Sequence, residues 1–260
     1  MNVKQIVLIS FSLFLATACQ DEEMEIPNPE DVRLKSVQTI GHGWTLSTVY
    51  DYLPDGNLTT VQWERNTPFT TIGTEEYVYG ADKRLEKQII SISGVVVTEM
   101  RYSYFQGKIV AASAYVEGIK DHYTFFEYNQ AGQLIRTEHF KRDDEANGYF
   151  QDGEQVFSYH ADGNLHKIEL AVFSSEVGGL IWNNTKTYAS YRSEPSVVDS
   201  ESILPGLKLQ KNLPTGYELE TAGDKFKYSF AYRFYPNGLP ADRVTTYPDG
   251  QTEQSVYTYQ

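Results

Sequence analysis

The chain has 260 residues, of which 14% are aromatic, and this length suits one large domain or two small ones. Its 35 Asp and Glu residues outnumber its 22 Lys and Arg residues, so the net charge is −13 at pH 7. Such an acidic surface repels phosphate backbones, which argues against nucleic acid as a partner, and a single cysteine excludes an intrachain disulfide.

Residues 1–18 have the pattern of a signal peptide. Lys4 supplies the positive start, residues 6–15 are apolar, and this run is too short to span a membrane. The residues that lead into Cys19 resemble a bacterial lipobox. The resemblance implies cleavage before Cys19 and lipid on its thiol; the alternative is an unmodified small residue near the cleavage site.

Residues 19–36 are expected to form a flexible acidic tether, because Asp21–Glu25 carries four acids and Pro27 and Pro29 follow. The acidic run resembles the short export signal of surface lipoproteins of the Bacteroidota. We therefore expect a protein anchored by lipid to the outer membrane and displayed on the cell surface, with a periplasm-facing position as the alternative.

A repeated phrase organises residues 37–260: an aromatic, any residue, an aromatic, a turn with glycine, then Leu or Ile. It is clearest at Tyr50–Leu58 and Phe157–Leu165. Weaker copies begin at Tyr77, Tyr102, Phe126 and Tyr232. Residues two apart share one face of a strand, so each aromatic pair lies on one side and the mostly polar residue between them on the other.

The turns between the paired segments indicate hairpins. Pro54-Asp55-Gly56, Pro236-Asn237-Gly238 and Pro248-Asp249-Gly250 suit a type I turn closed by a glycine bulge. At one hairpin per roughly 25 residues, the chain should contain about 14 to 18 strands. The fold class is all-β: an antiparallel meander of hairpin repeats that forms a barrel-like or strongly curled sheet.

The repeat is interrupted near residues 174–216. Pro195, Pro205 and Pro214 would break regular strands, so we expect a long loop over 195–216 with one helical turn near 200–204. The remainder of 37–260 is a single β-meander domain with this irregular insertion.

Tyr50–Leu58 and Phe126–Leu134 resemble the tyrosine-aspartate (YD) repeats of Rhs-type proteins. Over most of the chain, the repeats, Lys211–Pro214 and the ending from Tyr232 to Tyr259 resemble a Bacteroidota lipoprotein family of unknown function with a porin-like fold. That resemblance implies a meandering barrel with surface or periplasmic display and no known activity. The polar residues within the repeats favour a soluble barrel with an apolar interior over a membrane pore.

Catalytic and metal motifs are missing from the sequence. Its five histidines lack the spacing of a transition-metal site, and no Gly-x-Ser-x-Gly occurs. His160 and His166 flank one turn and could face each other, although two exposed hairpin residues are the simpler interpretation. We expect a protein that is not an enzyme and needs no cofactor.

Three residues are candidates for ligand binding: Trp182, Asn183 and Asn184, which fall where the repeat is interrupted. The repeat tyrosines are expected to pack in the core. The hypothesis is a non-enzymatic module that binds an extracellular ligand, for example a glycan, through loops or a barrel mouth. The alternatives are a carrier of lipid or another apolar molecule inside the barrel, and a structural or adhesive module that binds an envelope protein.

Overall fold

Eighteen strands account for the regular structure of the described residues in this computed structural model, which describes residues 32–197, 203–205 and 207–260. Cys19 and most of the tether therefore lie outside the described residues. Within that part of the chain, no helix has the length and hydropathy that a membrane span requires. The strands are β1 (Leu34–Gly41), β2 (Trp44–Tyr52), β3 (Leu58–Asn66), β4 (Thr70–Tyr79), β5 (Leu85–Ile92), β6 (Val95–Phe105), β7 (Lys108–Val116), β8 (Ile119–Tyr128), β9 (Leu134–Asp143), β10 (Gly148–Tyr159), β11 (Leu165–Ser174), β12 (Gly179–Thr187), β13 (Tyr191–Pro195), β14 (Asn212–Pro214), β15 (Gly216–Thr221), β16 (Asp224–Phe234), β17 (Pro240–Thr246) and β18 (Thr252–Tyr259).

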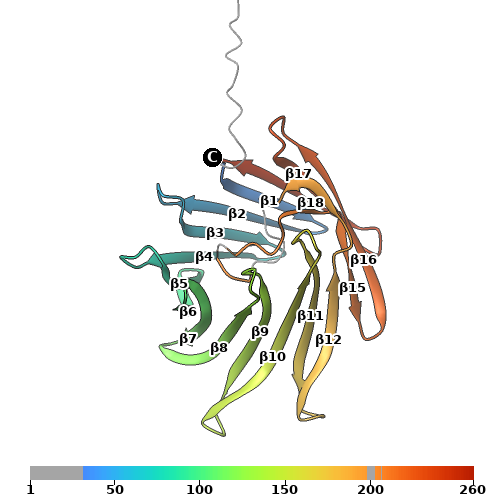
Figure 1. Cartoon of the computed structure of the whole chain (residues 1–260). Coiled ribbons are helices and arrows are strands. Elements are labelled where there is room, and N and C mark those ends of the chain that lie inside the picture. The colour runs from blue at the N-terminus through green and yellow to red at the C-terminus, as the bar shows by residue number, and fades with distance from the viewer. Residues whose placement is uncertain (1–31, 198–202, 206) are drawn as a thin grey trace, which may run out of the picture.

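Sixteen of these strands form one closed antiparallel barrel (Figure 1). Each barrel strand pairs with its neighbours in the chain, except that β12 pairs with β15 across the inserted β13 and β14. The barrel closes where β1 pairs with β18 over a register that runs from Leu34↔Tyr259 to Ile40↔Gln254. Closure leaves the sixteen-stranded sheet without an exposed edge, so the expected all-β meander is confirmed in its barrel form.

The turns that follow β2, β4, β6, β8, β10 and β16 lie together at one end of the barrel, here called the repeat rim, whereas the Pro248-Asp249-Gly250 turn between β17 and β18 lies at the other end. In the β2–β3 turn, Leu53 N–H donates to Asn57 O at 2.8 Å and Gly56 N–H donates to Leu53 O at 2.9 Å, with Gly56 at φ 98°. The pairing shifts beside this turn, between Asp51 and Tyr52, as a glycine bulge requires. Equivalent pairs of hydrogen bonds close the turns after β8, β10 and β16.

The second aromatic of most repeats is a tyrosine because its hydroxyl bonds to the preceding repeat. Tyr52 Oη donates to Leu34 O at 3.0 Å, Tyr79 Oη to Leu58 O at 2.8 Å, and Tyr104 Oη to Leu85 O at 3.0 Å. In each case the acceptor is the first residue of a strand in the preceding hairpin. Tyr159 and Tyr259 make the same bond, to Leu134 O and Pro240 O. These tyrosines therefore bind neighbouring hairpins together at the repeat rim.

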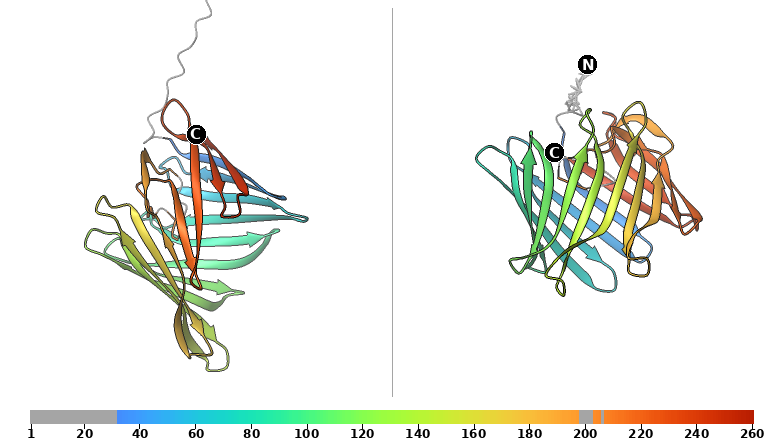
Figure 2. Two further views of the ribbon diagram at one scale, coloured as in Figure 1. Left: turned by 90° about the vertical axis from the view of Figure 1, so that its right-hand side faces the viewer. Right: turned by 60° about the horizontal axis from the view of Figure 1, so that its bottom comes forward.

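Between β12 and β15 the chain leaves the wall and crosses the interior. This inner segment, described at residues 188–197, 203–205 and 207–215, carries the two-stranded sheet of β13 and β14 (Figures 1 and 2). It is shorter than the interruption expected near 174–216, because residues 179–187 continue the wall as β12, but it begins earlier than the loop expected over 195–216. The strand β14 lies within that expected loop. The helical turn expected near 200–204 falls mostly outside the described residues.

The buried core lies where the inner segment packs against the wall. Tyr188, Leu204 and Leu209 of the segment are at most 4% exposed. They join a cluster with buried wall residues, namely Ala112, Phe126, Leu134, Phe157, Leu165 and Ile168. A sixteen-stranded barrel is too wide for its wall side chains alone to fill. The inner segment therefore supplies the core for the part of the barrel formed by β7–β11.

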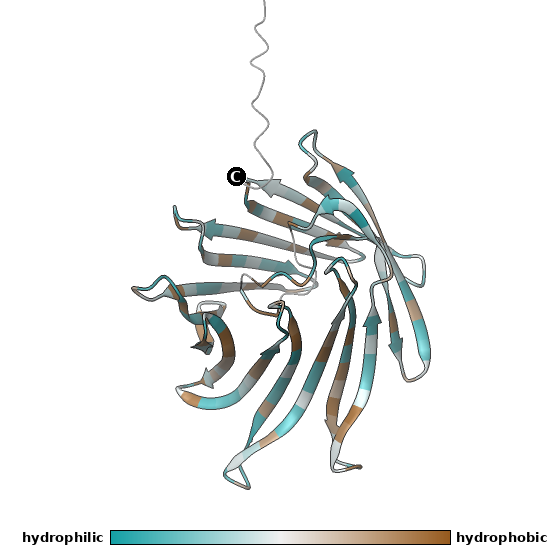
Figure 3. Cartoon of the chain, in the orientation of Figure 1, coloured by the Kyte–Doolittle hydropathy of each residue, from teal (hydrophilic) through white to brown (hydrophobic). Residues whose placement is uncertain are grey.

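The outer wall carries ion pairs at the positions that alternate with the core residues. Arg136 Nη2 lies 2.9 Å from both Glu138 Oε1 and Glu154 Oε2, and the fully buried Thr137 lies between Arg136 and Glu138 in the strand. Similar outward pairs are Lys87–Glu99, Lys167–Glu169 and Lys225–Glu218. Figure 3 shows the resulting mixture of hydrophilic and hydrophobic residues along the strands.

Candidate functional site: a cavity in the barrel lumen

A cavity of about 1330 Å³ lies in the barrel beside β1–β5. Its other side is formed by the inner segment, through residues that include Pro195, Leu204 and Lys208. The cavity exists because the inner segment packs against the opposite part of the wall, where the buried core cluster lies. The lumen is thus divided into a filled part and an open part, and the open part is large enough for a small organic ligand.

Two tryptophans lie flat against the cavity wall, each over a glycine of the neighbouring strand. A Cβ atom at Gly73 would stand 2.0 Å from Trp63 Cζ2, and one at Gly41 would stand 2.2 Å from Trp44 Nε1. The register places both pairs directly opposite, as Trp63↔Gly73 and Gly41↔Trp44. Each indole therefore occupies the space that a side chain would take, and both rings line the cavity.

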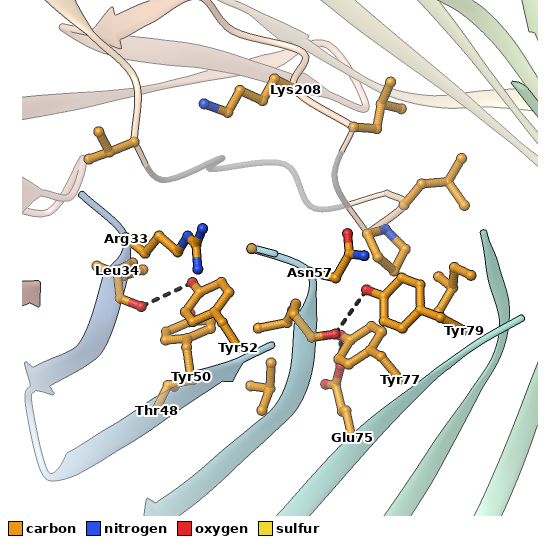
Figure 4. A pocket seen from close by; sticks show the side chains of 18 of the residues that line it. Arg33, Leu34, Thr48, Tyr50, Tyr52, Asn57, Glu75, Tyr77, Tyr79 and Lys208 are labelled. Carbon is orange, nitrogen blue, oxygen red and sulfur yellow. Dashed lines mark hydrogen bonds between the residues drawn. The ribbon is translucent and has the colours of Figure 1, made fainter. Parts of the chain in front are cut away.

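A carboxylate with two hydrogen-bond donors lies among the cavity tyrosines (Figure 4). Glu75 Oε2 accepts from Tyr77 Oη and from Gln88 Nε2, both at 2.7 Å, and Gln88 Oε1 accepts from Tyr102 Oη at 2.7 Å. Alternation along β4 explains its position, because Glu75 is two residues before Tyr77 and shares its face. A polar network thus lies within an otherwise aromatic wall.

The tyrosines around Glu75 remain protonated over the physiological range. Burial, with smaller contributions from Tyr52 and Glu75, raises the pKa of Tyr50 to about 12. Burial also raises the pKa of Tyr77, with the hydrogen bond to Glu75 as the second cause, and the pKa of Tyr102. Their hydroxyls therefore serve as neutral donors and acceptors rather than as bases.

Four cationic side chains line the cavity at the repeat rim: Arg33, Lys83, Arg84 and Lys208. Lys83 Nζ lies 3.5 Å from Asp55 Oδ2, and Arg84 Nε lies 3.5 Å from Asp82 Oδ2. Arg33 donates from Nη1 to Leu53 O at 3.3 Å, and its guanidinium lies 5.7 Å from the centre of the Tyr52 ring. Arg33 and Lys208 lie on different sides of this mouth (Figure 4).

The sequence-predicted candidates lie away from this cavity, on β12. Trp182 is 63% exposed. It pairs with Ala171 on β11, and Asn184 pairs with the adjacent residue, Leu170. Because adjacent residues of a strand point to opposite faces, Trp182 and Asn184 also lie on opposite faces of the sheet. Asn183 falls at the register shift between them. The three side chains thus do not converge on one site, and ligand binding at Trp182 stays a prediction.

His160 and His166 do face each other, with ring centres 4.5 Å apart, but they are half-buried. His160 Nε2 lies 2.8 Å from Tyr188 O, which ties the β10–β11 turn to the inner segment. Burial lowers the pKa of His166, and the neighbouring His160 lowers it further. No cluster of three or more potential metal ligands of the His, Cys, Asp or Glu type occurs among the described residues.

Sequence reasoning missed the cavity residues because it chose Trp182 among the three tryptophans and assigned the repeat tyrosines to packing. The missed residues are Trp44, Trp63, Glu75, Tyr50 and Tyr77. The sequence of β4 held a signal for the cavity. Gly73, Glu75 and Tyr77 stand at every second position of this strand and therefore share one face. A glycine and a carboxylate at positions that should be apolar indicate a face that is not closely packed.

No protein-family model and no curated protein matches the sequence. Two of the solved structures that resemble this chain extend over nearly all of it. A porin-like protein from Bacteroides uniformis is 14% identical, with a TM-score of 0.62 over 87% of this chain and 98% of its own. A porin-like protein from Bacteroides vulgatus is 11% identical, with a TM-score of 0.61 over 88% of this chain and 99% of its own. The chain therefore has the barrel fold of these porin-like proteins of Bacteroides.

Proposed function

We propose that the protein is a non-enzymatic, lipid-anchored envelope protein that binds a small amphipathic ligand, above all a glycan, in the lumen cavity. The observation that carries the proposal is the pair of tryptophan rings that lie flat over Gly73 and Gly41 and line a cavity of about 1330 Å³. Flat aromatic rings next to a few fixed polar groups are typical of pockets that orient a ligand.

A sugar suits this lining because its ring has apolar C–H faces and polar hydroxyl edges. The faces would stack on Trp44 and Trp63, while the hydroxyls would donate to Glu75, to which Gln88 also donates. Both polar side chains are already held by tyrosine hydroxyls, so little side-chain entropy would be lost on binding.

A carrier of an apolar molecule is the second candidate. It is favoured by the aliphatic side chains that also line the cavity: Leu46, Leu58, Val61, Leu85 and Ile109. It is disfavoured by Glu75, because an apolar ligand would remove water from the carboxylate without replacing its hydrogen bonds.

The proposed anchor is lipid on Cys19, joined through the acidic tether to the repeat rim. Arg33 N–H donates to Gln260 O at 3.0 Å, so both ends of the described chain leave the barrel together (Figure 2). The ion pairs on the outer wall support a barrel that stands in water, since a charge facing lipid at mid-membrane costs about 2–4 kcal/mol. Cys19→Ala should move the protein from the membrane to the soluble fraction; continued anchoring would refute the lipid proposal.

The binding proposal is tested by calorimetry with soluble oligosaccharides. Trp63→Ala should weaken binding about tenfold or more, because it removes a stacking ring, whereas Trp182→Ala should leave binding unchanged. If Trp182→Ala weakened binding and Trp63→Ala did not, the binding site would lie on the outer wall instead of in the lumen. Displacement of a bound fatty acid probe, with no response to any sugar, would favour the carrier.

A further inference from the structure

The charge at the mouth of the cavity is opposite to that of the protein as a whole. Although the net charge is −13, the four charged side chains that line the cavity at the repeat rim are all cationic. Lys83 and Arg84 have aspartate partners on the surface. For Arg33 and Lys208, no carboxylate of the described residues lies within ion-pair distance.

Arg33 is held at the mouth of the cavity by contacts with the rim. Its Nη1 donates to Leu53 O, its guanidinium lies 5.7 Å from the centre of the Tyr52 ring, and a Cβ atom at Gly56 would stand 2.5 Å from its Nη2. The turn glycine therefore makes room for the guanidinium. This positioning leaves further N–H donors, because a guanidinium carries five.

Lys208 comes from the inner segment and lines the same mouth from another side (Figure 4). Two cations from separate elements at one opening repel each other, and an anion between them would relieve that repulsion. An anionic group held by both would make charge-assisted hydrogen bonds, which are about twice as strong as neutral ones. The mouth is therefore suited to a carboxylate, sulfate or phosphate.

Glu75 sets the opposite preference deeper in the lumen. It lies four residues along β4 from Tyr79 at the repeat rim, which corresponds to about 13 Å of strand. Its carboxylate repels anions and accepts hydrogen bonds from hydroxyl groups. Arg65 also lines the cavity, 5.8 Å from the centre of the Trp44 ring, so the hydroxyl-bearing part of a ligand is favoured around Glu75 itself and an acidic group at the mouth.

We propose that the ligand is an acidic sugar, of the uronic acid class, which binds with its carboxylate between Arg33 and Lys208 and its hydroxyls toward Glu75. This inference rests on the proposed function, because it names the ligand class for the same cavity. A fatty acid offers the same carboxylate, but its tail would cover Glu75 without a hydrogen-bond donor. The sugar therefore satisfies both ends of the cavity.

The test compares three ligands on the purified chain by calorimetry: trigalacturonate, its methyl ester and palmitate. Trigalacturonate should bind more tightly than its methyl ester by about tenfold or more, and this advantage should shrink as salt rises from about 50 to about 500 mM. The salt and ester measurements need no variant, so they are independent of any folding defect.

Variants then locate the anion. Arg33→Gln and Lys208→Gln should each weaken trigalacturonate binding about tenfold and leave the methyl ester within about twofold. Lys87→Gln, on the outer wall, is the matched control and should change neither. Equal binding of acid and ester would overturn the inference while the lumen site stands. Binding of neither sugar would overturn both proposals, and Arg33-dependent binding of palmitate alone would assign the mouth to a lipid.

Discussion

Gly73→Ala tests the arrangement on which the cavity depends. The new methyl group would stand 2.0 Å from Trp63 Cζ2 and 2.1 Å from Trp63 Cε2, whereas ordinary contacts begin near 3.4 Å. The indole would have to move by more than about 1 Å, against a register that holds Trp63 opposite Gly73.

The expected cost follows from overpacking. A methyl group forced under the indole displaces the ring from its contact with the strand, and overpacking of this kind lowers the free energy of unfolding by about 1–3 kcal/mol. A relaxed Gly→Ala substitution in a strand instead stabilises by about 0.4–1 kcal/mol, because alanine restricts the unfolded chain. The steric cost therefore outweighs the entropic gain at Gly73, and the ring leaves its position over the glycine.

Gly179→Ala is the matched control, since Gly179 also lies in a strand and no atom lies within 4 Å of the position that an alanine Cβ would take there. Urea denaturation followed by circular dichroism should show a lower midpoint for Gly73→Ala with an unchanged m-value, and no loss for Gly179→Ala. Tryptophan fluorescence should change only in Gly73→Ala. Equal midpoints and equal spectra for the two variants would refute the proposed contact.

Three further outcomes are expected. Tyr104→Phe should lose about 1 kcal/mol of unfolding free energy, because Leu85 O loses its donor in a partly buried setting. Tyr149→Phe, whose bond to Lys120 O is exposed, should lose less than about 0.5 kcal/mol. Leu209→Ala should cost about 2–5 kcal/mol in the same denaturation assay, because Leu209 is 2% exposed and joins the inner segment to the wall. Burial lowers the pKa of His139 in the folded protein. As pH drops below about 6.5, the imidazole is therefore protonated more readily in the unfolded chain than in the folded one, and the free energy of unfolding should fall. His139→Gln should flatten that fall between about pH 7.5 and pH 5, and an unchanged profile would remove His139 as its source.

The strands, turns and alternation of this barrel were predictable because they depend on neighbouring residues. A residue two positions from an aromatic shares its face, and a Pro-Asp-Gly sequence turns the chain wherever it stands. The hydroxyl bond from Tyr79 to Leu58 O follows from the same repeat, since each hairpin meets the preceding one in the same way. The sequence alone thus determined an antiparallel meander with one aromatic face.

The tertiary structure decided which aromatic side chains of that face are buried in the core and which line the cavity. Tyr77 and Phe126 hold the same position in the repeat, yet Phe126 is buried in the core and Tyr77 lines the cavity. The difference arises from the inner segment, whose residues are distant in sequence from both and whose buried Leu204 and Leu209 join the core cluster that contains Phe126 and not Tyr77. Closure of β1 on β18 also joins the two ends of the described chain. Burial depends on such long-range contacts, so local pattern could place the aromatics on one face but could not divide them between core and cavity.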